Sequence, residues 1–74
     1  MRQSELRELR LALSENIRIL RGKRGLSQER LALEAGVDRT LVSKIERTIA
    51  NPTLDVLAKL ALVLDVPVVR LLKN

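Results

Sequence analysis

Apolar residues recur at spacings of three and four along the first part of the chain, at Leu6, Leu9, Leu13, Ile17 and Leu20. This period predicts an amphipathic helix with a single apolar stripe. Ser4 is its expected N-cap, because a serine hydroxyl can accept a hydrogen bond from the free N–H groups of a first turn. Arg21, Lys23 and Arg24 suit a helix C-terminus, and Gly25 is expected to follow as a left-handed cap.

Two short helices are predicted next, separated by a tight turn at residues 36–37. The segment SQERLALEAG opens with Ser27 as N-cap and stops at Gly36. The second of the two helices is expected to run from Asp38, another N-cap, to about Arg47. Two short helices joined by such a turn form a helix-turn-helix, whose second helix fits the major groove of DNA. The first of them is expected to bury Leu31, Ala32 and Ala35.

The last third of the chain is more uniformly apolar. A helix capped by Thr53 carries only Asp55 and Lys59 as polar residues before Asp65, which predicts a central, buried helix. A short turn of helix from Pro67 to Leu72 is expected after it, since proline suits a first helical position. The predicted fold is therefore all-α, a compact five-helix bundle in a single domain over residues 1–74.

The helix predicted after Asp38 has two contrasting faces when its residues are placed about 100° apart. Leu41, Val42 and Ile45 fall in one arc and are expected to pack inward, with Glu46 at the boundary. A solvated charged face is the simpler explanation of the other arc, but such faces normally mix signs at i,i+4. This one contains no acid and favours an anionic ligand. Its residues are Arg39, Thr40, Ser43, Lys44 and Arg47.

Charge and composition narrow the choice of ligand. Fourteen Lys and Arg against nine Asp and Glu give a formal net charge of +5 and a pI of about 10.8. This charge favours a polyanion, because Lys and Arg release counterions when they neutralise phosphates. The chain has no Phe, Tyr or Trp, so it lacks the aromatic platforms on which single-stranded bases stack. Double-stranded DNA is the expected partner.

Several other classes of protein are excluded by the residues that the sequence lacks. Without Cys and His there are no disulfides, no thiolate or imidazole metal sites and no cysteine or histidine catalysis. We find no carboxylate pair, nucleophile-base constellation or phosphate-cradling glycine loop, so neither an enzyme nor a cofactor is expected. The apolar runs are too short to span a bilayer and no signal-peptide pattern is present. A cytoplasmic protein that does not associate with membranes is expected.

From about Glu15 to Leu72 the sequence resembles the phage-repressor family of helix-turn-helix domains, the Cro/lambda-repressor or XRE type. The motifs that carry the resemblance are GLSQERLA, Gly36 in the turn, SKIER, and NPTLDVLAKLA at the expected separations. The resemblance implies a lambda-repressor-like bundle in which residues 28–47 read DNA. It also implies a transcriptional regulator that binds a pseudo-palindromic operator as a homodimer. The segment before Ser14 extends the first helix beyond its usual start in the family.

The resemblance also assigns roles to individual residues. Gln28 matches a position that touches the phosphate backbone and supports the recognition helix, although its simplest role is that of an exposed residue at a helix start. Arg39, Thr40 and Lys44 match positions that reach base edges, with Ser43 beside them and Arg47 nearer the backbone. Arg21 and Glu46 match a pair that the family often joins as a salt bridge between the first and third helices; for this pair we expect a structural role.

The sequence departs from the family pattern after residues 45–47. The family commonly has a glycine there, followed by basic residues that grip phosphate, whereas this chain reads TIAN. Thr48 and Asn51 are the remaining candidates for a phosphate contact in this loop. Asp65 stands where the family often has glycine, which an aspartate can replace in a left-handed cap.

Two functions from different classes follow. The first is a sequence-specific DNA-binding regulator, and the second is a protein-interaction module that binds a toxin or another regulator through the same fold. Small autoregulating repressors, controller proteins of restriction-modification systems and antitoxins all match this description. The apolar C-terminal segment exceeds what one short turn of helix can bury, which predicts a homodimer built mainly on the last helix and the end of the fourth. The expected contributors are Val68, Val69 and Leu72, and the alternative is that these residues close the core of the monomer.

Overall fold

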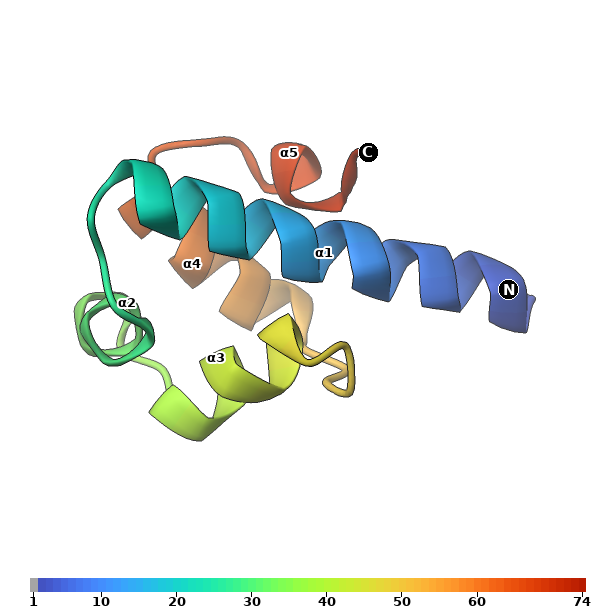
Figure 1. Cartoon of the computed structure of the whole chain (residues 1–74), viewed down its shortest axis with the longest axis horizontal. Helices are drawn as coiled ribbons and strands as arrows, with labels where there is room; N and C mark the ends of the chain where they lie inside the picture. Colours follow the sequence, from blue (N-terminus) through green and yellow to red (C-terminus); the bar gives the residue numbers. More distant parts are fainter. Residues whose placement is uncertain (1) are drawn as a thin grey trace.

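The computed structural model describes residues 2–74, which form five α-helices and no strand. The expected all-α, five-helix fold is confirmed. The first helix lies across the other four, and its N-terminal part projects beyond them (Figure 1). At about 1.5 Å of rise per residue, its 21 residues account for most of the 33 Å long axis of the molecule. The helices are α1 (Gln3–Lys23), α2 (Gln28–Ala35), α3 (Arg39–Glu46), α4 (Leu54–Leu64) and α5 (Val68–Leu72).

One hydrophobic core receives residues from every helix. The fully buried side chains are aliphatic, in keeping with a chain that has no aromatic residue. Each fills space between helices that are distant in the sequence, so the core fixes how α2 and α3 sit against α1 and α4. No helix within residues 2–74 has the length and apolarity needed to cross a membrane. The fully buried side chains are Ile17, Leu31, Val42, Ile45, Leu60 and Leu71.

Most of the expected helix ends are confirmed. The hydroxyls of Ser27 and Thr53 and the carboxylate of Asp38 accept hydrogen bonds from N–H groups in the first turns of α2, α4 and α3. Gly25 has the left-handed φ of 65° that ends α1. The prediction for the start of α1 is wrong: the helix begins at Gln3, so Ser4 lies inside its first turn and no side chain caps it.

The expectation of a central, buried α4 is wrong for one of its faces. Leu57, Leu60 and Leu64 face the core, but Leu54 and Leu62 are 75% and 82% exposed. A domain of this size has no further layer to cover the outer face of a helix that packs on α2 and α5. The apolar composition of α4 predicted burial, but composition does not reveal how many neighbouring helices are available to cover it. The outer face of α4 therefore leaves Leu54 and Leu62 exposed to solvent.

A buried asparagine that the sequence analysis did not single out anchors α5. The side-chain amide of Asn16 donates to the carbonyl oxygens of Leu71 and Lys73, at 2.9 and 2.6 Å. Its oxygen accepts a hydrogen bond of 2.9 Å from Arg70. These bonds satisfy carbonyls that the last turn of a helix leaves free. They hold α5 against the middle of α1, beside the buried Leu71.

Candidate nucleic-acid interface

The turn between α2 and α3 is short and well defined. Gly36 ends α2 with φ 71° and ψ 35°, a conformation that costs glycine little and other residues more. The N–H of Val37 donates to the carbonyl of Ala32 at 3.0 Å, as expected where a left-handed residue closes a helix. Asp38 then caps α3, since its Oδ1 accepts from the N–H of Thr40 at 2.8 Å. The turn therefore leads directly from one helix into the next.

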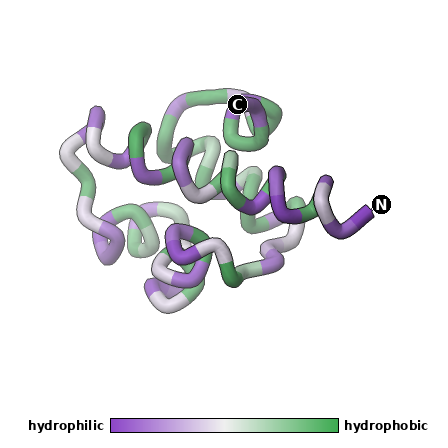
Figure 2. Tube along the Cα trace, turned by 45° about the vertical axis from the view of Figure 1, so that its right-hand side comes forward, coloured by the Kyte–Doolittle hydropathy of each residue, from purple (hydrophilic) through white to green (hydrophobic). Residues whose placement is uncertain are grey.

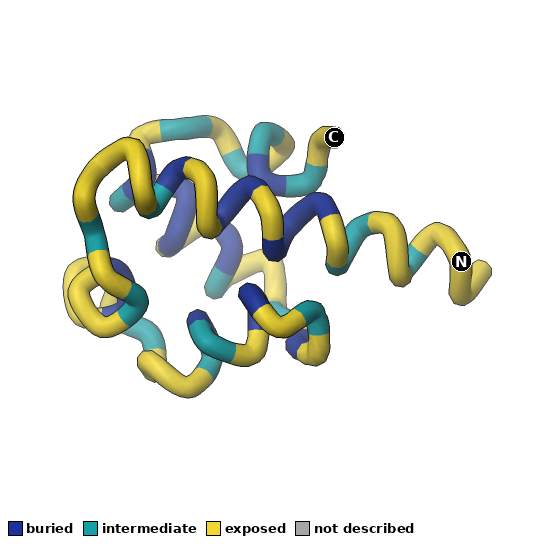
Figure 3. Tube along the Cα trace, in the orientation of Figure 1, coloured by how far each residue is buried: buried dark blue, intermediate teal, exposed yellow. Residues whose placement is uncertain are grey.

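Helix α3 has a buried face and an exposed, positively charged face. Val42 and Ile45 are buried against the core, and Leu41 is half-buried beside them. The opposite face is polar and open to solvent, as the hydropathy and exposure of α3 show (Figures 2 and 3). Ser43 is half-buried, and with Arg39 and Thr40 it lines a shallow hollow on this surface. The exposed residues of the face are Arg39, Thr40, Lys44 and Arg47.

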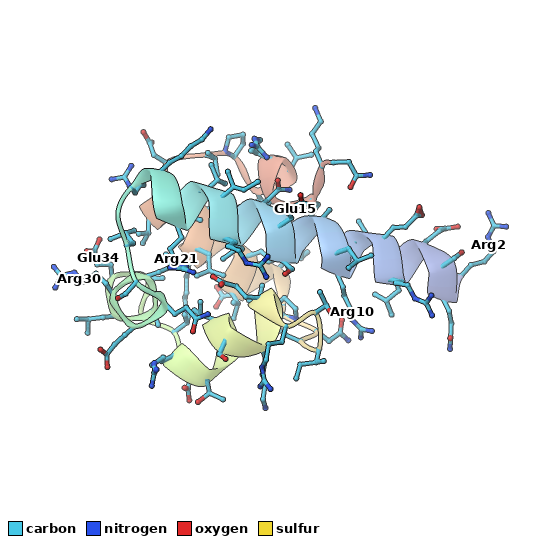
Figure 4. The ribbon with its side chains drawn as sticks, viewed as in Figure 1. Arg2, Arg10, Glu15, Arg21, Arg30 and Glu34 are labelled. Atoms are coloured by element: carbon cyan, nitrogen blue, oxygen red, sulfur yellow. The ribbon has the colours of Figure 1, made fainter. Side chains whose placement is uncertain are left out.

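A network centred on Glu46 ties α3 to α1 and α2. The carboxylate of Glu46, 6% exposed, accepts from Arg21 Nε at 2.7 Å and from Arg21 Nη2 at 3.0 Å, so the expected ion pair is formed. Figure 4 shows Arg21 reaching from α1 toward α2 and α3. Gln28 Nε2 donates to Glu46 Oε1 at 3.0 Å. Two contacts that the sequence analysis missed go to the Glu46 carbonyl, from Ser14 Oγ at 2.7 Å and from Arg18 Nη2 at 3.0 Å.

This network changes the protonation behaviour of its members. Burial on its own raises the pKa of Glu46, but the hydrogen bonds from Arg21 and Gln28 and the charges of Arg21 and Arg18 outweigh it, so the pKa is lowered. The hydrogen bond to Glu46 likewise raises the pKa of Arg21. Both groups are therefore held in their charged forms. A charged, multiply bonded pair at this position fixes the last turn of α3 relative to α1.

The end of α3 is conformationally unusual. Thr48 has φ 63°, in the left-handed region that a β-branched residue rarely adopts. Its N–H donates to the carbonyl of Ile45, and the N–H of Ile49 donates to that of Lys44, both at 3.0 Å, which is how a helix closes on a left-handed residue. The hydroxyl of Thr48 donates to the carbonyl of Arg47. Because a hydroxyl has one proton, donating to a phosphate requires that bond to break.

Comparison with known proteins gives a matching family and close relatives. A family model described as helix-turn-helix (HTH_3) matches residues 17–71. A hypothetical transcription factor from Neisseria meningitidis is 43% identical over 65 residues, which are 88% of this chain and 61% of that protein. The chain thus spans less than two thirds of the length of this relative.

Solved structures with the same fold include regulators of two kinds. The restriction-modification controller protein C.AhdI from Aeromonas hydrophila is 39% identical, with a TM-score of 0.79 over 84% of this chain and 94% of that one. The biofilm regulator SinR, which is found in Bacillus subtilis, was solved in complex with DNA. It has a TM-score of 0.79 at 39% identity over 82% of this chain and 98% of that one. SinR was also solved in complex with the SinI protein.

Proposed function

Because the chain belongs to the helix-turn-helix (HTH_3) family, we propose that it is a sequence-specific regulator of transcription that binds double-stranded DNA through α3. The observation that carries the proposal is the exposed face of α3, which has three basic residues and no acid. The acid within α3, Glu46, points inward and is neutralised by Arg21. The face therefore presents uncompensated positive charge on an element that fits a major groove.

The position of each side chain supports a division of roles. Arg39 and Thr40 lie in the first turn of α3, where the N-terminal residues of a recognition helix contact base edges. Lys44 follows one turn later on the same exposed face, with Ser43 beside it. Arg47 lies at the C-terminal end of α3 and is assigned to the DNA backbone.

Gln28 and Thr48 are also assigned to contacts with the DNA backbone, and they lie at the two ends of the helix-turn-helix. The amide of Gln28 uses one donor on Glu46 and keeps a second N–H for a phosphate oxygen. Gln28 thereby links the phosphate contact to the ion pair that orients α3. Thr48 follows Arg47 directly, so that its hydroxyl lies beside the same stretch of backbone.

We further infer a homodimer that binds a pseudo-palindromic operator. Val69 is 60% exposed and Leu62 is 82% exposed, on two helices that pack against each other. Val68 and Leu72 are half-buried and also contact the core, so only part of each is free for a partner. A second copy packed on the exposed faces of α4 and α5 would cover apolar side chains that the single chain leaves in water.

Selection of duplexes from a random pool tests the proposed function. The protein is expected to enrich a common, pseudo-palindromic sequence, and to bind it at least a thousandfold more tightly than a random duplex in fluorescence anisotropy at physiological salt. Equal affinity for selected and random duplexes would overturn the proposal, because it would leave only non-specific binding to phosphate. Circular dichroism on the same preparation establishes that the protein is folded.

A protein-interaction module is the second candidate, because the related SinR is solved with a protein partner. A toxin or another regulator would then occupy the apolar face of α4 and α5 rather than the basic face of α3. The two candidates respond differently to Arg39→Ala with Lys44→Ala. A regulator of transcription would lose its operator, whereas an interaction module would keep its partner.

A further inference from the structure

A stripe of arginines runs along α1 on a single face. At about 100° per residue its four members fall within an arc of about 80°. The acids of α1, Glu5, Glu8 and Glu15, fall outside that arc, so the stripe has one sign of charge. Like the exposed face of α3, it is a basic surface without interspersed acids. The four members are Arg7, Arg10, Arg18 and Arg21.

The two halves of the stripe have different partners. Arg21 and Arg18 contact Glu46 and hold α3 in place. Arg7 and Arg10 form no ion pair within residues 2–74. Arg7 is exposed, while Arg10 is half-buried with its Nε shielded from solvent and without a hydrogen-bond partner. A guanidinium that is partly removed from water and has no anion is in an unfavourable state, which an anionic ligand would relieve.

The unpaired arginines lie beside the end of α3. Arg7 and Arg10 line a surface hollow together with Thr48. A neighbouring hollow is lined by Arg18, Arg47 and again Thr48. Figure 4 shows Arg10 extending from α1 toward the loop that follows α3. Arginines of α1 thus line both hollows beside Thr48, together with Arg47, Glu15 and the ion-paired Glu46 in the second. The loop itself has no basic residue between positions 48 and 53.

We propose that Arg7 and Arg10 bind phosphates of the DNA backbone that flanks the groove occupied by α3. This inference rests on the proposed function, because it takes the end of α3 to lie at the backbone. Guanidinium groups bind phosphate oxygens in a bidentate manner and carry no sequence information when they do so. Residues 7–18 span about 16 Å of helix, so these contacts lengthen the footprint beyond the one that α3 provides.

The test compares the salt dependence of binding for the wild type and for Arg7→Gln with Arg10→Gln. The probes are the duplex selected above and a random duplex of equal length, each titrated by anisotropy between 50 and 200 mM KCl. Each lost phosphate contact lowers the slope of log K against log salt by about 0.9, so the double variant should lose about 1.8. Its deficit in affinity should therefore be about tenfold larger at 50 than at 200 mM, on both duplexes alike.

Two control variants distinguish the loss of these phosphate contacts from a general loss of positive charge and from a change in packing. Arg2→Gln with Lys73→Gln removes two exposed charges that lie off the stripe, and should leave the slope at its wild-type value. Arg7→Lys with Arg10→Lys keeps both charges and should retain the slope. The proposal is overturned if the Gln variant keeps the wild-type slope, if the Arg2 and Lys73 control loses as much, or if the Lys variant loses as much.

The wild-type titration distinguishes failure of this inference from failure of the proposed function. A wild type that does not prefer the selected duplex overturns both. A wild type that prefers it, with an unchanged slope in the Gln variant, overturns only the role of Arg7 and Arg10. If the Gln variant instead retains its DNA affinity and loses binding to an acidic protein, the surface serves a protein partner and the proposal is also wrong. Thermal midpoints by circular dichroism verify that all variants are folded.

Discussion

Glu46 is an ionised acid in a buried position of the helix that we assign to DNA reading. Its lowered pKa means that the folded state favours the carboxylate over the acid. The stabilisation is therefore complete above the unfolded pKa of about 4.3 and is lost as the pH falls through the lower, folded value. We expect Glu46→Gln to lower the free energy of unfolding by about 2 kcal/mol at pH 7. This gap between variant and wild type should shrink as the pH is lowered toward 3.

Urea unfolding followed by circular dichroism at both pH values measures this gap. Glu34→Gln is the matched control, because Glu34 forms an exposed pair with Arg30 at 2.7 Å. An exposed pair contributes about 0 to 1 kcal/mol, so the control should differ little from wild type at either pH. A gap for Glu46→Gln that is the same at pH 3 and pH 7 would contradict the prediction.

Arg39 and Arg47 are both exposed arginines, yet they should behave differently on DNA. Arg39→Ala should cost about 1 to 3 kcal/mol on the preferred operator and relax the choice at one base pair, because a guanidinium in the first turn can bind guanine O6 and N7. Arg47→Ala should weaken all duplexes alike and lower the salt slope by about one. Titrations of operator variants at several salt concentrations measure both effects. An equal loss on operator and random duplex would make Arg39 a phosphate contact.

Individual residues differ in how far the sequence could predict their surroundings. The pair Arg21 and Glu46 could be anticipated from the resemblance to a known family. The bonds from Ser14 and Arg18 to the Glu46 carbonyl could not, because they depend on the angle at which α1 crosses α3. The sequence did hint at the Arg18 contact, because Arg18 lies one turn before Arg21 on the same face of α1. The hollow shared by Arg7, Arg10 and Thr48 likewise could not be predicted without tertiary structure, because Thr48 lies 38 positions after Arg10 along the chain.

Among the helices, α3 ends on a residue that is poorly suited to its conformation. Asp65 closes α4 at φ 59°, but its short polar side chain tolerates the left-handed region better than a β-branched one does. Gly25 and Gly36 adopt positive φ without a side chain, whereas Thr48 does so with a branched one. A left-handed conformation costs a residue with a Cβ about 1 to 2 kcal/mol. We expect Thr48→Gly to raise the free energy of unfolding by about 0.5 to 1 kcal/mol, after the greater flexibility of glycine in the unfolded chain is subtracted.

Thermal unfolding should show this gain as a rise of a few degrees, since 1 kcal/mol corresponds to about 4 to 8 °C in a domain of this size. Thr48→Ala removes the same hydroxyl and branch but keeps a Cβ at positive φ. It should therefore gain much less than the glycine variant. If the alanine variant gains as much as the glycine variant, the left-handed conformation of Thr48 is not the source of the strain.

The helix ends that local chemistry fixes could be predicted from the sequence, whereas the exposure of the outer helix faces could not. Ser27, Asp38 and Thr53 cap helices because their short polar side chains reach the adjacent N–H groups, an effect that depends on neighbouring residues only. Ser4 has the same chemistry but lies within α1, because the backbone already turns helical before it. The exposure of Leu62 depends on how many helices surround α4, which local pattern does not encode.

The molecule exposes both basic and apolar side chains, and we assign the basic ones to DNA and the apolar ones to a second copy of the chain. Arg47 at the end of α3 and Arg7, Arg10 and Arg18 of α1 line two hollows that share Thr48, whereas apolar Leu62 and Val69 are exposed on α4 and α5. One copy measures 33 × 21 × 19 Å and has one α3, the helix that we propose reads DNA. Reading two half-sites about 34 Å apart therefore requires two copies, and the apolar surface is where we place the contact between them.

Leu62→Lys with Val69→Lys tests this placement, because a lysine on each helix would bring like charges together and bury them across a symmetric interface. We expect the wild type to sediment as a dimer of the 8.3 kDa chain at micromolar concentration, and the variant to sediment as a folded monomer. Leu33→Lys is the control, since Leu33 is 69% exposed on α2, outside the apolar surface of α4 and α5, and its substitution should leave the dimer intact. On the selected operator the monomeric variant should bind more weakly and occupy half-sites independently. Wild-type protein that sediments as a monomer would overturn the proposed dimer. A Leu33→Lys variant that dissociates would show that the dimer contact involves α2 instead.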